Sequence, residues 1–121
     1  MQNLDRFKFR VFEKDSGIFY PDQDSLYAYL SGKYPDSIVM QCTGLKDKNS
    51  DLIFEGDIVQ FRSEVSGKKI IAKVIWYSTQ WVCENHQGDS ISFFGGLNIA
   101  MGFRPEIIGN LYENPELLES I

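Results

Sequence analysis

The chain has 121 residues, the length of a single domain, and at this size folding removes about two-thirds of the unfolded surface from water. With 43% hydrophobic and 14% aromatic residues, the composition excludes disorder for most of the chain and favours β-sheet. Acidic residues outnumber basic ones, 17 to 12, so the net charge of -5 opposes contact with nucleic-acid phosphates.

The first predicted strand covers residues 7–11, where apolar and basic residues alternate. An alternation with a period of two residues places the apolar side chains toward the core, and Lys8 and Arg10 toward water. A turn at residues 14–17 and a return strand at residues 18–20 complete a predicted hairpin.

Residues 21–37 differ in character, with two prolines and a short apolar cluster. One interpretation is a two-turn helix near residues 24–31, capped by Asp24 or Ser25 and ending at Gly32. The other interpretation is a loop that crosses over the sheet, and the sequence leaves this choice open.

From residue 38 onward, short apolar runs alternate with turn residues, which is typical of a sandwich or a small barrel. The predicted strands cover residues 38–42, 52–54, 58–62, 69–77, 80–85, 90–94 and a last piece at 107–108. Between the second and third of these strands, Gly56 is predicted to form a sharp corner, with the Glu55 and Asp57 carboxylates in water. We therefore predict one mostly-β domain over residues 1–121, a small barrel (SH3-like in one form) or a two-sheet domain, ending in a short helix.

The C-terminal segment predicts that short helix, because a capping Asn114 and Pro115 precede apolar residues. A helix of about seven residues is unstable alone in water, so its apolar side chains must dock on its own sheet or on a neighbouring subunit. Residues 1–14 carry a net charge of +2 and residues 106–121 one of -4, which favours contact between the termini, within one chain or between two. We expect a homo-oligomer, and the candidate contact residues are Pro115, Leu117, Leu118 and Ile121.

Four segments together resemble the YopX family of phage and prophage proteins. They are residues 7–12 (FKFRVF), residues 40–59 with the run IFEGDIV, residues 74–76 (VIW) and residues 108–118 (IGNLYENPELL). The resemblance implies a mostly-β domain encoded in phages and prophages, and it implies no established activity or site residues. Ser50 stands where the family commonly has Gly, and residues 22–37 and 95–105 have no counterpart.

No arrangement of residues typical of catalysis or of metal binding is found in the sequence. His86 is the single histidine, and it lies three positions after Cys83. In a strand, residues an odd number of positions apart point to opposite faces, so we expect His86 to be out of reach of the Cys83 thiol. With Cys42 as the second cysteine, the chain lacks the four ligands of a zinc site, and both thiols are expected to be free and buried. The pair Gly95-Gly96 lacks a phosphate-loop pattern, so we predict no enzyme, no cofactor and no metal.

The functional prediction is a non-enzymatic accessory protein that self-associates or binds a host or phage protein. We expect it in the cytoplasm of a bacterial host, since the sequence lacks a secretion signal and a membrane-spanning apolar run. Neither a membrane nor nucleic acid is expected as a partner. An alternative is a nucleic-acid platform on one sheet face, formed by Lys8, Arg10, Lys69 and Lys73. An enzyme with an unrecognised site is the third possibility.

Overall fold

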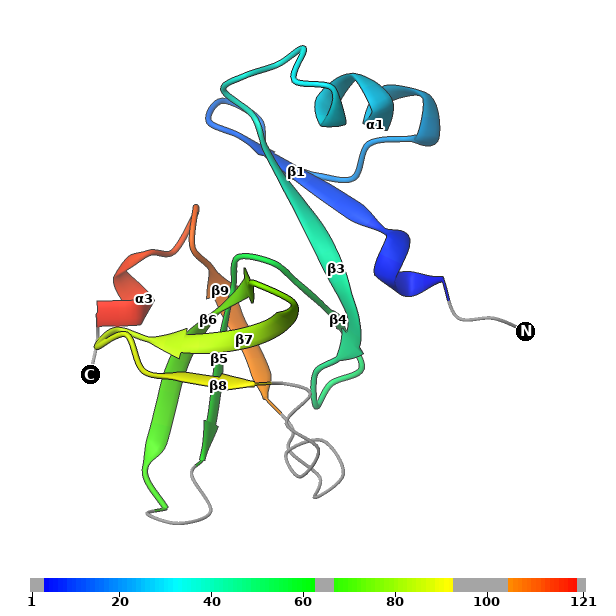
Figure 1. Cartoon of the computed structure of the whole chain (residues 1–121). Helices are drawn as coiled ribbons and strands as arrows, with labels where there is room; N and C mark the ends of the chain where they lie inside the picture. Colours follow the sequence, from blue (N-terminus) through cyan, green and yellow to red (C-terminus); the bar gives the residue numbers. More distant parts are fainter. Residues whose placement is uncertain (1–3, 63–66, 93–104, 120–121) are drawn as a thin grey trace.

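The computed structural model describes residues 4–62, 67–92 and 105–119, with two antiparallel sheets and three short helices (Figure 1). The first sheet has the order β2-β1-β3-β4 and contains β1 (Phe9–Glu13), β2 (Gly17–Phe19), β3 (Ile38–Lys46) and β4 (Leu52–Phe54). The second sheet has the order β8-β7-β6-β5-β9 and contains β5 (Asp57–Arg62), β6 (Lys69–Tyr77), β7 (Gln80–Asn85), β8 (Ser90–Ser92) and β9 (Glu106–Asn110). The helices are η1 (Asp5–Phe7), α1 (Gln23–Leu30) and α3 (Glu116–Glu119). The predicted mostly-β, two-sheet domain with a short C-terminal helix is confirmed.

The two sheets are joined at the corner between β4 and β5. Gly56 has φ +86°, which favours glycine, and a Cβ there would lie 3.0 Å from the Tyr112 ring and 3.2 Å from the Met40 sulfur. The predicted corner is thus confirmed, but its acidic residues do not all face water. Asp57 is 1% exposed, so its predicted solvation was wrong.

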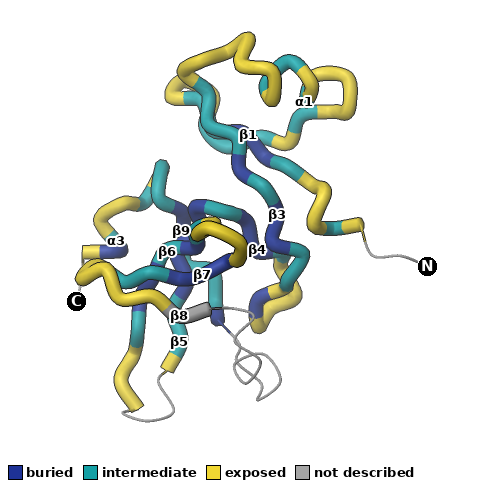
Figure 2. Tube along the Cα trace, viewed as in Figure 1, coloured by how far each residue is buried: buried dark blue, intermediate teal, exposed yellow. Residues whose placement is uncertain are grey.

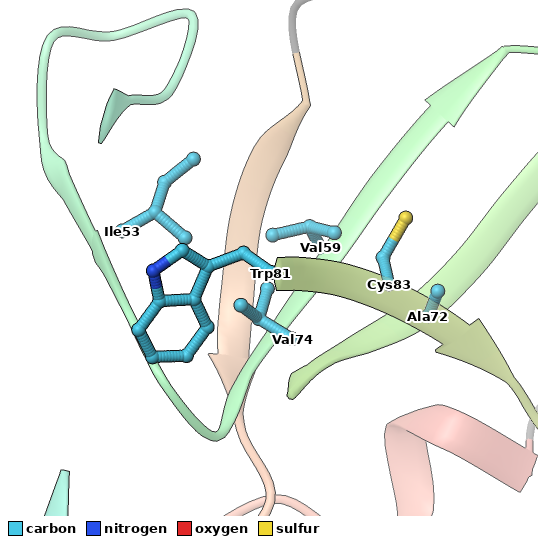
Figure 3. Packing of buried hydrophobic residues seen from close by; sticks show 6 residues of the cluster. All are labelled: Ile53, Val59, Ala72, Val74, Trp81 and Cys83. Carbon is cyan, nitrogen blue, oxygen red and sulfur yellow. The ribbon is translucent and has the colours of Figure 1, made fainter. Parts of the chain in front are cut away.

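The main core lies between β4 and the inner face of the second sheet. It contains Ile53, Val59, Ala72, Val74, Trp81 and Cys83, whose side chains converge in Figure 3. A second cluster lies on the other face of β5, where Ile58 and Ile71 pack against Leu118 of α3. β5 therefore buries both faces. For this reason the neighbouring residues Ile58 and Val59 are each fully buried, although a half-buried strand would expose one of them.

The segment before β3 contains the predicted helix, here α1. Its N-cap is Asp22, whose carboxylate accepts a 2.7 Å hydrogen bond from the Ser25 N–H, so neither Asp24 nor Ser25 is the cap. No residue of α1 is buried (Figure 2), and the helix is held by Tyr29, which packs edge-on against Phe19 and donates to the Glu13 carboxylate at 3.0 Å. Among the described helices, none combines the length and the apolar composition that a membrane span requires.

The N-terminal strand differs from its prediction. β1 begins at Phe9, and Phe7 lies in η1 with 55% of its surface exposed, so its predicted inward position was wrong. Lys8 is exposed as predicted, whereas Arg10 is only 7% exposed instead of facing water. The cause is Asp57, a buried acidic partner on the other sheet.

The turn between β3 and β4 is organised by Asp47. One oxygen of its carboxylate accepts from the N–H groups of Asn49 and Asp51, and the other accepts from the Ile107 N–H at 3.1 Å. Ser50 in this turn has φ +69°, the left-handed conformation that costs a non-glycine residue about 1–2 kcal/mol.

Replacing Ser50 by Gly should therefore raise the free energy of unfolding by about 0.5–1 kcal/mol, once the greater chain entropy of glycine is subtracted. Urea denaturation measures this change. Ser50→Ala is the matched control, because alanine keeps the strained φ and should bring no gain. A stabilised alanine variant would contradict this explanation.

Candidate binding groove

A groove of about 940 Å³ is bounded by residues of both sheets and by the start of α1. Its lining residues are Phe7, Lys8, Phe9, Arg10, Tyr20, Pro21, Gln23, Leu26, Ser50, Asp51, Leu52, Phe54, Asp57 and Ile107. We call it the inter-sheet groove. Its size lies in the range of about 300–1,000 Å³ that is usual for ligand pockets.

A buried ion pair between the two sheets contributes to the lining of the groove. Arg10 on β1 donates from Nη2 to Asp57 Oδ1 on β5 at 2.6 Å, and to the Glu55 carbonyl at 3.4 Å. The second carboxylate oxygen, Oδ2, accepts from the Phe54 N–H at 2.7 Å. The Arg10 guanidinium also lies over the Phe54 ring, 4.8 Å from its centroid. This pair therefore fixes β1 against the β4–β5 corner.

The electrostatics of this pair reflect its burial. Removal from water raises the pKa of Asp57, and the Arg10 charge and the Phe54 N–H oppose that rise. Arg10 Nε is buried and has no hydrogen-bond partner in the structure. The guanidinium therefore keeps one donor without an acceptor.

The rim of the groove is aromatic and carries little net charge. Phe7 and Tyr20 are 55% and 67% exposed, and Tyr20 packs edge-on against Phe54 with ring centroids 5.9 Å apart. The ionisable lining residues are two basic, Lys8 and Arg10, and two acidic, Asp51 and Asp57. Their formal charges cancel.

The four basic residues considered for nucleic acid lie on different sheets. Lys8 and Arg10 precede or belong to β1, whereas Lys69 and Lys73 belong to β6. Lys8 contacts Asp5 at 3.0 Å and Lys73 contacts Glu84 at 3.6 Å, while Arg10 is buried. Of the four, only Arg10 and Lys8 line the groove.

Cys83 and His86 lie in different environments. Cys83 is buried in the main core on β7, and His86 is exposed in the turn that follows. Burial raises the pKa of the Cys83 thiol to about 12 and also raises the pKa of Cys42, so both thiols are protonated at neutral pH. Within residues 4–62, 67–92 and 105–119, no group of three His, Cys, Asp or Glu residues could hold a metal ion. The pair Gly95-Gly96 lies outside the described residues.

Burial of Cys83 predicts slow alkylation and sensitivity to a polar replacement. Iodoacetamide at about pH 8 should leave the native thiol unmodified over hours, whereas the urea-unfolded chain reacts within minutes. Cys83→Ser should lower the free energy of unfolding by about 1–3 kcal/mol, because it buries a hydroxyl in the core. His86→Ala is the control at an exposed site, where the free energy of unfolding should change by less than about 0.5 kcal/mol. A larger change would contradict the assignment of His86 to the surface.

The candidate residues for self-association are divided between the chain's own core and its surface. Leu118 is 8% exposed and packs on Ile58 and Ile71 of the same chain, and Leu117 is partly buried beside them. Pro115 is exposed, and Ile121 lies outside the described residues.

The two ends of the chain also meet within one molecule. Phe12 of β1 stacks on Tyr112 with ring centroids 5.4 Å apart. The side-chain oxygen of Asn114 accepts from the Asn110 N–H at 3.2 Å, which closes the turn between β9 and α3. The docking that the sequence left open is therefore seen on the chain's own sheet.

Sequence reasoning missed the groove because its members are scattered. Tyr20, Phe54 and Ile107 are ordinary apolar residues of short strands or their flanks, and no spacing joins them. The one available signal was Asp57, an acidic residue inside the run Ile-Phe-Glu-Gly-Asp-Ile-Val, since a carboxylate among buried residues requires a partner.

Comparison with known proteins identifies the family. The crystal structure of protein EF1440 from Enterococcus faecalis has a TM-score of 0.61 to this chain at 23% identity, over 92% of this chain and 96% of that one. This likeness shows the fold alone. A search of curated proteins found no match. The model of the YopX protein family matches residues 20–119, so the resemblance at residues 7–12 lies before the matched range. Because that match spans most of the sequence, the chain belongs to the YopX protein family.

Proposed function

We propose that this protein is a non-enzymatic accessory protein of phage or prophage origin, and that it binds another protein chain in the inter-sheet groove. The observation that carries the proposal is the groove itself, which has the size of a binding pocket and a lining in which eight of the fourteen residues are apolar or aromatic. A few polar groups at fixed positions, Arg10 and Asp57 among them, are typical of such a site. The phage origin is supported by what the YopX resemblance implies.

The chemistry of the lining supports binding rather than catalysis. General acid–base or nucleophilic catalysis needs a base within hydrogen-bond reach of a nucleophile or a substrate proton. Neither His86 nor either cysteine lines the groove. Asp57 is hydrogen-bonded to Arg10 and to the Phe54 N–H, so its carboxylate is already committed to the fold.

Self-association is the second part of the proposal. Tyr27 and Leu30 of α1 are 76% and 53% exposed, and Tyr34 close by is also exposed. Exposed apolar side chains gathered on one element are typical of protein contacts. We therefore assign contact between copies to the outer face of α1 instead of to Leu117 and Leu118.

The mass of the full chain in solution tests this proposal. Sedimentation at about 50 µM in about 150 mM salt should give a mass above the 13.9 kDa of one chain, and a 20-base-pair DNA should not change it. The Tyr27→Ser/Leu30→Ser variant should fold and sediment as a monomer. A monomeric wild-type chain would reject self-association, and a micromolar complex with the DNA would replace protein binding by nucleic-acid binding.

A further inference from the structure

We infer that the inter-sheet groove binds an extended, uncharged peptide segment of another protein, which pairs with the open edge of β1 and inserts an aromatic or aliphatic side chain. This inference rests on the proposed function, because it names the partner class of the same groove.

The first observation is an incomplete strand pairing. β2 pairs with β1 at Val11, Phe12 and Glu13, in the register Val11↔Phe19. Continued by two residues, that register would set Pro21 opposite Phe9. Proline has no N–H to donate, and the chain turns at Asp22 into α1. Among the described strands, none therefore pairs with Phe9 on the side that β2 occupies further along.

The second observation is that the groove lies along this edge. Side chains of a strand alternate between its two faces, so a pocket that borders one face alone is lined by every second residue. Phe9 and Arg10 are neighbours in β1, and both line the groove, together with Pro21. The groove consequently borders the edge of the β1 segment as well as a face.

The third observation is the chemistry of the groove. Two basic and two acidic side chains cancel in formal charge, so the lining complements an uncharged segment rather than an anion or a cation. The aromatic rings of Phe7, Tyr20 and Phe54 provide apolar walls. A side chain of the peptide fills the apolar space between these walls.

An extended peptide satisfies all three observations together. Its backbone offers N–H and C=O groups to a strand edge, and its alternate side chains point to one face. Such strand addition is a known mode of peptide recognition, in which main-chain hydrogen bonds give affinity and pockets for alternate side chains give specificity.

The test is selection from a displayed library of random peptides of about twelve residues, against the immobilised full-length protein. Enriched peptides should be uncharged, with aromatic or aliphatic residues at every second position. Phe7→Ser and Tyr20→Ser should each weaken binding of a selected synthetic peptide by about tenfold or more. Tyr77→Ser is the matched control, because Tyr77 is an exposed tyrosine of β6 outside the groove lining, and this variant should bind the peptide with unchanged affinity.

Backbone chemistry supplies a second readout. N-methylation of alternate peptide amides removes the donors needed for strand pairing, so one of the two alternating methylation patterns should abolish binding and the other should not. Equal tolerance of both patterns, enrichment of charged peptides, or binding that Phe7→Ser and Tyr20→Ser leave intact would overturn this inference. Peptides sensitive to Tyr77→Ser instead would overturn the inference and move the binding site to β6. An absence of enrichment together with a monomeric mass would overturn the proposed function as well.

Discussion

Replacing Arg10 by Met should lower the free energy of unfolding by about 3–5 kcal/mol at neutral pH. Methionine fills the volume of the side chain but leaves the Asp57 carboxylate 1% exposed and without its charged partner. It also removes the guanidinium from the Phe54 ring. Urea denaturation of the wild type and the variant measures the loss.

The control for this prediction is the double variant Arg10→Met/Asp57→Asn. Asparagine carries no charge, and its side-chain oxygen can still accept from the Phe54 N–H, so the double variant should be more stable than Arg10→Met alone. If the losses of Arg10→Met and of Asp57→Asn, each measured alone, simply add in the double variant, the ion pair has no coupling energy.

The pH dependence of the same variant has a defined sign. Burial raises the pKa of Asp57 above its ordinary 3.8, so the folded protein holds this proton more tightly than the unfolded chain. The contribution of this tighter proton binding to the free energy of unfolding is fully present below pH 3.8, and it is lost as the pH rises through the pKa of Asp57 in the folded protein. Arg10 limits the rise in the pKa, and Arg10→Met removes that limit.

The difference in stability between wild type and Arg10→Met should therefore be smaller at about pH 4 than at pH 7. Urea denaturation at both values, corrected for any change in the m-value, measures it. A difference that stays constant with pH would contradict the assignment of the loss to a charged Asp57.

Replacing Leu118 by Asp should lower the free energy of unfolding by about 2–4 kcal/mol. The side chain is 8% exposed and packs on Ile58 and Ile71, so aspartate would put a charge into this cluster and release α3 from the sheet. Thermal or urea unfolding of the full chain measures the change.

Leu30→Asp provides the matched control, because this leucine is 53% exposed on α1. Its substitution should change stability by less than about 0.5 kcal/mol, although it removes an apolar side chain from the proposed contact between copies. If Leu118→Asp kept full stability and only reduced the mass of the protein in solution, α3 would dock on a partner subunit instead of on its own sheet.

Much of the fold could be predicted from local patterns. The alternation of apolar residues predicted β6 over residues 69–77 and β7 over residues 80–85, and the structure confirms both. Turn chemistry placed Gly56 at the corner, where φ is +86°. The apolar residues after Asn114 predicted a short helix that must dock. These features depend on neighbours in sequence, so the sequence alone is sufficient to predict them.

The partners of individual side chains were decided by tertiary structure. Arg10 lies in an alternating strand, and the pattern alone assigned it to water. Its partner, Asp57, is 47 residues away in the sequence, on the other sheet. A local period in the sequence does not indicate that two residues so far apart form a pair. For this reason the buried ion pair, and with it the lining of the groove, was not predicted.

The sequence by itself determined a mostly-β domain of the YopX type with a docked C-terminal helix, because strand periodicity, turn residues and capping act over a few positions. Only the tertiary structure decided that Leu118 docks on the chain's own β5 and β6, and that β1 keeps an open edge beside Pro21. Both outcomes follow from how two sheets pack, since packing brings together residues whose separation along the chain carries no signal.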